Sequence, residues 1–276
     1  MRDRTWRTDA PDPETGRPGI AGVLRGSLKA ILLVIVNFGC LALLLLVRAI
    51  EAPLFAPRRP ITPWITQFVC RTSLAIIGLS YRIEGRAQAG GGAMVANHSS
   101  WLDIYALNAS TRLYFVSKAE VARWPGIGWL ARATGTVFIT RQRTQTRAQV
   151  ALFRERLGLG HELLFFPEGT STDGRRVLPF NPTLFEAFLD PSLAENLNLQ
   201  PISVIYEAPA GADPRFYGWW GDMSFGGHLW SVLTAPRQGR ITVRYHPALP
   251  VKDFTGRKAL SKAAEDAVRV PELSAT

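Results

Sequence analysis

Short apolar runs alternate with longer stretches of mixed polarity from residue 81 to the C-terminus. The apolar runs predict strands at residues 81–84, 93–96, 112–116, 135–140, 162–166, 201–206 and 240–246. The stretches between them predict helices at residues 101–109, 118–133, 144–157, 182–189 and 256–269. Strands that alternate with helices are typical of an α/β domain, in which helices cover the faces of a sheet.

An uncharged apolar stretch lies nearer the N-terminus. Residues 30–47 carry no charged side chain, and this length is close to the minimum for a membrane span. The polar segment before it is longer than that of a usual signal peptide. A buried core helix is the remaining alternative. We therefore expect a polar, loosely held tail over residues 1–28 and a membrane helix over residues 29–50.

A second apolar helix is expected at residues 63–79, after a break that is rich in proline. This helix contains one charge, Arg71, which argues against a simple span and for an interfacial or re-entrant helix. The chain then divides into the tail, a two-helix membrane-associated segment over residues 29–80, and an α/β domain over residues 81–276.

The charge balance favours an anionic partner. The formal net charge is +10, which suits either nucleic acid or an anionic membrane surface. The apolar helices favour a membrane surface as this partner, and we expect no nucleic-acid binding. Cys40 and Cys70 both lie in apolar stretches, and no cysteine and histidine cluster has the spacing of zinc ligands, so we expect no metal.

Two short motifs follow predicted strands and carry candidate chemistry. The first, at residues 97–103, places His98 and Asp103 five positions apart, and the second is the sequence Phe-Pro-Glu-Gly-Thr at residues 166–170. A histidine with a carboxylate partner can take a proton from a hydroxyl. A glycine loop with free N–H groups can hold a phosphate or an oxyanion. Together the motifs predict acyl transfer or hydrolysis, although each alone also fits a surface histidine or a plain turn.

Four ordered blocks make the chain resemble the lysophospholipid acyltransferase family, whose members acylate 1-acylglycerol-3-phosphate. They are NHSSWLD at residues 97–103, GTVFITR at 135–141, FPEGT at 166–170 and QPISVIY at 200–206. The resemblance spans about residues 60 to 250. It implies a glycerophosphate acyltransferase-like α/β fold with a mixed sheet flanked by helices. It also implies an N-terminal membrane hairpin and an acyltransferase domain over residues 81–276.

The resemblance also implies roles for individual residues. His98 is the expected general base, with Asp103 holding its tautomer and offsetting its charge, and acyl transfer is direct, without an acyl-enzyme. The expected acyl donor is acyl-CoA or acyl-carrier protein, used as a substrate, and no cofactor is expected. Ser99 and Ser100 are interpreted as residues of a helix N-terminus, and Asn97 as a structural residue of the loop.

Lys118 and Arg141 are the candidates for binding an anionic head group, because both lie beside matching blocks. Glu168 and Gly169 are expected to shape the oxyanion or phosphate loop, with Thr170 hydrogen-bonding nearby.

The sequence departs from the family pattern in two places. Thr140 stands where the second block usually carries Asp or Asn, and Ser171 stands where the third block often has Arg. The lost cation weakens the case for a phosphate head group, unless Arg175 or Arg176 replaces it. The run from FPEGT to residue 180 and the sequence at residues 219–230 also resemble the lyso-ornithine lipid acyltransferase branch, whose acceptor has no phosphate.

The lead prediction is therefore an O-acyltransferase acting on a lysolipid, with 1-acylglycerol-3-phosphate as acceptor and phosphatidate as product. Lyso-ornithine lipid is the alternative acceptor. A membrane-anchored hydrolase is disfavoured because the chain has no Gly-x-Ser-x-Gly motif. The aromatic-rich loop at residues 208–229 has two interpretations, an interfacial or acyl-channel patch and a cover over the sheet edge.

Basic residues set the expected orientation. More of them precede the first apolar helix than follow it, which places the N-terminus in the cytoplasm. A single crossing would then put His98 outside, away from acyl-CoA and acyl-carrier protein. We expect instead a monotopic hairpin on the cytoplasmic face of the inner (plasma) membrane, with both chain ends inside.

Overall fold

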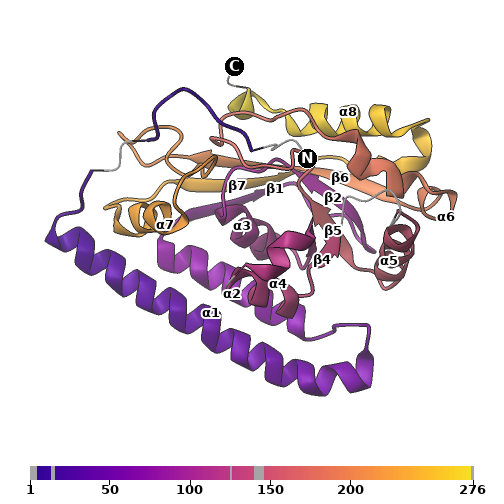
Figure 1. The fold of residues 1–276 in the computed structure, drawn as a ribbon, viewed down its shortest axis with the longest axis horizontal. Helices are drawn as coiled ribbons and strands as arrows, with labels where there is room; N and C mark the ends of the chain where they lie inside the picture. The colour runs from indigo at the N-terminus through magenta and orange to yellow at the C-terminus, as the bar shows by residue number, and fades with distance from the viewer. Residues whose placement is uncertain (1–4, 14–15, 125, 140–145, 275–276) are drawn as a thin grey trace.

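A computed structural model describes residues 5–13, 16–124, 126–139 and 146–274 of the chain. Its described strands form one sheet in the order β1-β7-β6-β2-β5-β3-β4, with β8 paired to β6 (Figure 1). The strands are β1 Ser80–Glu84, β2 Gly92–Ala96, β3 Tyr114–Lys118, β4 Val137–Ile139, β5 Glu162–Phe165, β6 Asn198–Glu207, β7 Arg240–Tyr245 and β8 Leu249–Pro250. Because β6 is parallel to β2 but antiparallel to β7, the sheet is mixed, as predicted.

The helices lie on both faces of this sheet. The α-helices are α1 Ile20–Phe55, α2 Thr62–Ile77, α3 Leu102–Ser110, α4 Ile127–Ala133, α5 Thr146–Gly158, α6 Pro191–Ala194, α7 Phe225–Thr234 and α8 Arg257–Val268. Short 3₁₀ helices are η1 Ala119–Arg123, η3 Pro182–Leu189, η4 Val251–Asp253 and η5 Pro271–Leu273. The helix predicted at 182–189 is thus present, but as a 3₁₀ helix.

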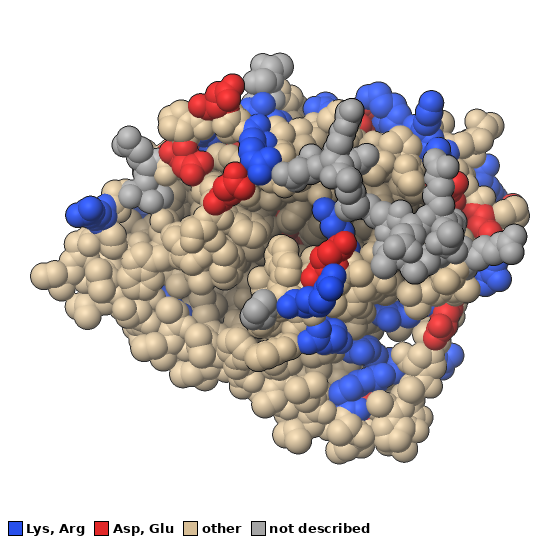
Figure 2. All heavy atoms as spheres, in the orientation of Figure 1, with Lys and Arg blue, Asp and Glu red and all other residues tan. Residues whose placement is uncertain are grey.

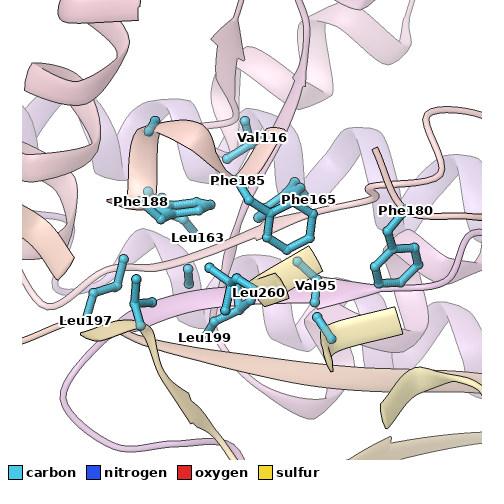
Figure 3. Close-up of a cluster of buried hydrophobic side chains, with 14 of the residues drawn as sticks. Val95, Val116, Leu163, Phe165, Phe180, Phe185, Phe188, Leu197, Leu199 and Leu260 are labelled. Carbon is cyan, nitrogen blue, oxygen red and sulfur yellow. The ribbon is translucent and has the colours of Figure 1, made fainter. Parts of the chain in front are cut away.

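Two apolar cores fill the spaces between the sheet and its helices, and alternation along β2 divides the strand between them. Ala93 and Val95 face the core that α5, η3 and α8 cover, part of which is drawn in Figure 3. Met94 and Ala96 face the other core, under α2, α3 and α7. All four side chains are fully buried, so β2 is a central strand covered on both faces.

The two N-terminal helices form a hairpin that packs on the domain. The first helix is longer than predicted at both ends and runs along α2 and α7 (Figure 1). Glu51 ties its end to the start of α2, because its carboxylate accepts the backbone N–H groups of Ile61 and Thr62 at 2.6 and 3.1 Å. Arg71 in α2 is exposed, and its guanidinium donates to the carbonyl oxygen of Ala109, in α3, at 2.9 Å.

The outward face of α1 is apolar and exposed. Leucine, isoleucine, valine and phenylalanine side chains are exposed along the whole helix, from Ile20 to Phe55. Among the described residues, α1 is the helix long and apolar enough to cross a membrane by length and composition. An apolar surface of this size on a protein marks a site of contact with a membrane or a partner.

Three segments differ from the prediction. The helix predicted at 118–133 is divided into η1 and α4, because Gly126 has a left-handed φ of 72° that interrupts the helix. The predicted loop at 208–229 already contains the start of α7, whose N-cap is Ser224. The polar tail contains the first turns of α1, and its residues 5–13 make defined contacts with the domain.

Candidate active site

The site lies at the carboxyl ends of three neighbouring strands. His98 follows β2, the FPEGT loop follows β5, and Tyr206 lies near the end of β6. Because β5 and β6 are both parallel to β2 and pair with it on either side, the three segments meet at one edge of the sheet. This edge is where open α/β sheets hold their ligands.

His98 and Asp103 are in direct contact, as the sequence predicts. The Nδ1 atom of His98 lies 2.7 Å from Oδ2 of Asp103, and the aspartate side chain is fully buried. The imidazole stacks on the ring of Phe166, with ring centroids 4.2 Å apart. Because Nδ1 contacts the carboxylate, Nε2 is the ring atom that can take a proton from a substrate hydroxyl.

The Asp103 carboxylate is held by further hydrogen bonds. Its Oδ2 atom accepts the backbone N–H groups of Ser99 and Ser100 at 2.8 and 3.0 Å. Ser99 and Ser100 lie directly before α3, as expected, and are fully buried; the N-cap of α3 is Trp101, which makes no side-chain cap bond. Asp103, in the first turn of α3, thus satisfies the backbone N–H groups of the two residues that precede the N-cap.

Tyr206 completes the shell around Asp103. Its hydroxyl donates to Oδ1 of Asp103 at 2.5 Å. Burial, followed by the charge of Asp103, raises the pKa of Tyr206 well above its ordinary value, so the phenol stays protonated. Sequence reasoning assigned no role to this residue. The signal available was a hydroxyl at the end of a buried strand, within the fourth block of the family pattern.

Asn97 has the structural role that was expected. Its side-chain amide donates to the carbonyl oxygen of Val204 at 2.9 Å and accepts the N–H of the same residue at 2.8 Å. The loop after β2 is therefore fixed to strand β6. The neighbouring Ser99 carbonyl accepts the backbone N–H of Trp219 at 2.8 Å, which fixes the loop on its other side.

Glu168 shapes the loop around His98. Its two carboxylate oxygens accept the backbone N–H groups of His98 at 2.7 Å and of Leu178 at 2.9 Å. Burial raises the pKa of Glu168 to about 8, outweighing the lowering by these two hydrogen bonds. The side chain is buried away from the cavity described below, so its contacts hold the base in place.

Gly169 and Thr170 turn the same loop toward Lys118. The backbone of Gly169 has a left-handed φ of 76°, which favours glycine. Its carbonyl oxygen accepts a hydrogen bond from Nζ of Lys118 at 3.0 Å. Lys118, Gly169 and Thr170 all line the cavity that contains His98, so the structure brings these predicted residues together. Arg141 lies outside the described residues, as does Thr140.

The two arginines considered as replacements for the missing family cation do not line this cavity. Arg176 forms a bidentate ion pair with the buried Asp173, with distances of 3.0 and 3.2 Å to Oδ2 from Nη2 and Nε. Its guanidinium also lies 5.2 Å from the ring centroid of Trp6. The backbone N–H of Arg175 is bonded to Asp173 as well. These contacts assign the Arg176 side chain to the support of the loop.

A large cavity of about 2360 Å³ opens on the site. One part is lined by apolar residues of α1, α2 and α3, among them Phe38, Leu41, Val69 and Ile104. Another part lies beside β4, α5 and η3. Ser171, Lys118 and His98 also line this cavity. A cavity of this size can hold long acyl chains next to the catalytic pair.

The aromatic loop has residues in both of the positions considered for it. Trp219 and Phe225 line the cavity, whereas Tyr217 and Trp220 are buried as a cover over the domain. A contact that sequence reasoning missed joins this region to the first motif. The indole N–H of Trp101 donates to Nδ1 of His228 in α7 at 2.9 Å. Burial lowers the pKa of His228, which keeps this imidazole neutral and able to accept.

Comparison with known sequences identifies the same region. A family model described as Acyltransferase matches residues 80–205. The chain is 54% identical over 264 residues to the lyso-ornithine lipid O-acyltransferase of Rhodobacter capsulatus, covering 96% of this chain and 95% of that one. It is 33% identical to the lyso-ornithine lipid O-acyltransferase of Pseudomonas aeruginosa, covering 77% and 78% of the two chains. The 1-acyl-sn-glycerol-3-phosphate acyltransferase of Neisseria gonorrhoeae is 35% identical over 41% of this chain and 45% of its own.

A solved structure has the same fold. The crystal structure of the 1-acyl-sn-glycerophosphate acyltransferase from Thermotoga maritima matches with a TM-score of 0.62, over 90% of this chain and 94% of that one, at 18% sequence identity. The fold expected from the family resemblance is therefore confirmed. The family model and the relatives at 54% and 33% identity show that this chain belongs to the lysophospholipid acyltransferase family and is a lysolipid acyltransferase.

Proposed function

We propose that the acceptor is a lyso-ornithine lipid, the alternative acceptor of the sequence analysis. The observation that carries this choice is the 54% identity to a lyso-ornithine lipid O-acyltransferase over nearly the whole chain. Relatives named for 1-acyl-sn-glycerol-3-phosphate are similar over shorter stretches, 41% of this chain for the Neisseria gonorrhoeae enzyme and 56% for one from Chlamydomonas reinhardtii. Lysophosphatidate, the lead acceptor of the sequence analysis, is therefore the second candidate.

The polar lining of the cavity also supports an acceptor without phosphate. Ser171 stands where an arginine is frequent in the family, and Arg176 is engaged by Asp173. A phosphate monoester carries up to two negative charges and is bound best by several cations or a bidentate arginine. An ornithine head group linked through one amino group carries a carboxylate and an ammonium group, so its net charge is close to zero.

The proposed reaction is direct acyl transfer. The Nε2 atom of His98 removes the proton of the acceptor hydroxyl while that oxygen attacks the thioester carbonyl of the donor. The imidazolium that forms is stabilised by Asp103, which Tyr206 and two N–H groups hold in place. The carbon–sulfur bond then breaks, and the leaving thiolate takes up the proton from His98. The donor is acyl-CoA or acyl-carrier protein, used as a substrate, and the reaction as written needs no cofactor or metal.

The membrane contact is assigned to the α1–α2 hairpin. The apolar outward face of α1 suits contact with lipid, while its other face packs on α2 and α7. A helix that packs along the domain in this way fits a protein embedded in one leaflet. We place the domain on the cytoplasmic side of the inner (plasma) membrane, where acyl-CoA and acyl-carrier protein are found.

The test is an acyl-transfer assay of membranes that contain the protein. Lyso-ornithine lipid and lysophosphatidate are offered side by side with a labelled acyl donor. We expect labelled ornithine lipid, and a rate with lysophosphatidate at least tenfold lower. Phosphatidate formed at the higher rate would overturn the choice of acceptor and favour the second candidate. The same assay with acyl-CoA and with acyl-carrier protein identifies the donor.

A further inference from the structure

We propose that the N-terminal arm (residues 5–13) forms one wall of the acceptor head-group site, and that Arg7 and Asp222 bind the two charges of the head group. This inference rests on the proposed function, because it concerns the acceptor of the same reaction. Arg7 and Asp222 are 215 residues apart in the sequence. Neither lies in the four family blocks, although Asp222 falls within residues 219–230, which resemble the lyso-ornithine lipid acyltransferase branch.

The arm is bound to the catalytic loops. The backbone N–H of Trp6 donates to the hydroxyl oxygen of Thr170, in the FPEGT loop, at 3.2 Å. The Trp6 ring meets Trp220 edge to face, with centroids 5.9 Å apart. On another side it lies 5.2 Å from the guanidinium of Arg176, which the buried Asp173 orients. These contacts fix the arm against loops from both β5 and β6.

The arm reaches the cavity itself. Thr5 lines the cavity together with Gly221, Thr170, Lys118 and His98. In Figure 1 the indigo chain returns from the start of α1, past α7, toward the middle of the molecule. Figure 2 shows a hollow near the centre of this face, with acidic and basic side chains around its rim. The arm and the loop before α7 therefore border the cavity outside the loops that carry the family motifs.

Arg7 and Asp222 supply opposite charges at this border. Each is within two residues of a residue that lines the cavity, and the guanidinium contacts the carboxylate at 3.0 and 3.2 Å. Their side chains are 53% and 81% exposed, so the pair itself is weak and its members can exchange partners. A head group with a carboxylate and an ammonium can insert between them, placing its anion on Arg7 and its cation on Asp222.

The same pair discriminates between acceptors. A phosphate head group has no cation to place beside Asp222, and the carboxylate repels it. Arg7 would attract the phosphate, so the two residues oppose each other for this acceptor. For the zwitterionic head group both contacts are favourable. Specificity then arises from an attractive and a repulsive contact together.

The experiment measures acceptor KM and kcat for the full-length protein and the single variants Arg7→Ala and Asp222→Ala. We expect KM for lyso-ornithine lipid to rise about tenfold in each, with kcat and the donor KM unchanged. With lysophosphatidate, Asp222→Ala should lower KM. The matched control is Arg240→Ala, which breaks the exposed Arg240–Glu207 pair between β7 and β6; neither residue lines the cavity. This control should leave both acceptor KM values unchanged.

A double variant, Arg7→Asp with Asp222→Arg, separates head-group binding from a purely structural role of the pair. If the pair only fastens the arm, the swapped charges restore the KM; we expect it to remain raised. An unchanged KM in both single variants, or restoration by the swap, would overturn the inference. A wild-type protein that does not use lyso-ornithine lipid would instead refute the proposed function, which the first measurement of the series reveals.

Discussion

The hydroxyl of Tyr206 donates a 2.5 Å hydrogen bond to the Asp103 oxygen that faces away from His98. The two contacts lie on opposite oxygens of one buried carboxylate, so tyrosine, aspartate and histidine form a continuous chain. Burial keeps the phenol protonated, and its proton therefore always points to the carboxylate. This arrangement fixes the carboxylate plane, and with it the direction in which the imidazole presents Nε2.

Tyr206→Phe should lower kcat about tenfold or more with little change in either substrate KM. The lost bond is to a charged acceptor, and such bonds contribute about 1.5–3 kcal/mol. Steady-state kinetics with purified protein measures the effect. The control is Tyr217→Phe, because that ring packs 5.7 Å from Tyr206 but its hydroxyl bonds to Gln238 and to the N–H of Gly239. If both variants lost kcat equally, the loss would come from disturbed packing, and the hydrogen bond from Tyr206 to Asp103 would have no specific role.

Asp103→Asn should lower kcat by about 10²–10⁴-fold. The asparagine amide cannot offset the imidazolium charge. In addition, its N–H₂ group must face a hydrogen-bond donor, because Tyr206, His98 and two backbone N–H groups surround this side chain. Single-turnover measurements report the chemical step. Asp266→Asn on the exposed face of α8 is the control for general effects of the substitution. Retained turnover in a folded Asp103→Asn protein would remove the aspartate from the mechanism.

Glu168→Gln should lower activity several-fold, because the amide N–H₂ must oppose the backbone N–H of either His98 or Leu178. An unsatisfied buried donor costs about 1–3 kcal/mol. Activity measured with lyso-ornithine lipid tests this, and Glu207→Gln, at an exposed position, is the matched control. Full activity in Glu168→Gln would mean that the loop around His98 does not depend on this carboxylate.

Glu168 also predicts a pH dependence of stability. Burial raises its pKa from 4.5 to about 8 in the folded protein, so the folded state binds this proton more tightly than the unfolded state. The stability that this proton contributes is present below pH 4.5 and is lost as the pH rises through about 8. Thermal unfolding in detergent should therefore show a smaller decrease in melting temperature between pH 5 and pH 8 for Glu168→Gln than for wild type. Parallel pH curves would contradict the shift.

The pattern of apolar residues along the sequence was sufficient to predict the strands at the centre of the sheet. Alternation and apolar runs gave β2 and β5 to within a residue, because both strands are buried on both faces. The motif order then placed His98, Lys118 and the FPEGT loop at one sheet edge. The prediction of one helix over residues 118–133 was wrong at Gly126. Hydrophobic periodicity does not indicate that this glycine has a left-handed backbone.

The missed contacts are those between distant parts of the chain. Tyr206 is 103 residues from Asp103 in the sequence. It contacts Asp103 only because β6 pairs with β2. The polar composition of the first residues predicted a loose tail, yet Trp6 binds Thr170 across 164 positions. Neither pairing leaves a periodic or spacing signal in a single sequence, since each depends on tertiary packing.

The topology remains a prediction with a direct test. Phe55 ends α1 at an exposed position, at the turn of the proposed hairpin. In a Phe55→Cys variant, with Cys40 and Cys70 replaced by serine, an impermeant thiol reagent added to intact cells should not label the protein. The same reagent should label it once the membrane is permeabilised with detergent. Robust labelling in intact cells would show that the chain crosses the membrane at this turn.

The most direct test of the account is the rate of acyl transfer to lyso-ornithine lipid by His98→Ala. A general base contributes about 10²–10⁴ in rate, and we predict a loss of at least 100-fold. The variant should remain folded and membrane-bound, because the His98 side chain is partly exposed and its loop is held through backbone groups by Glu168 and Thr172. Activity above roughly a tenth of wild type in such a folded protein would contradict the assignment of His98 as the base.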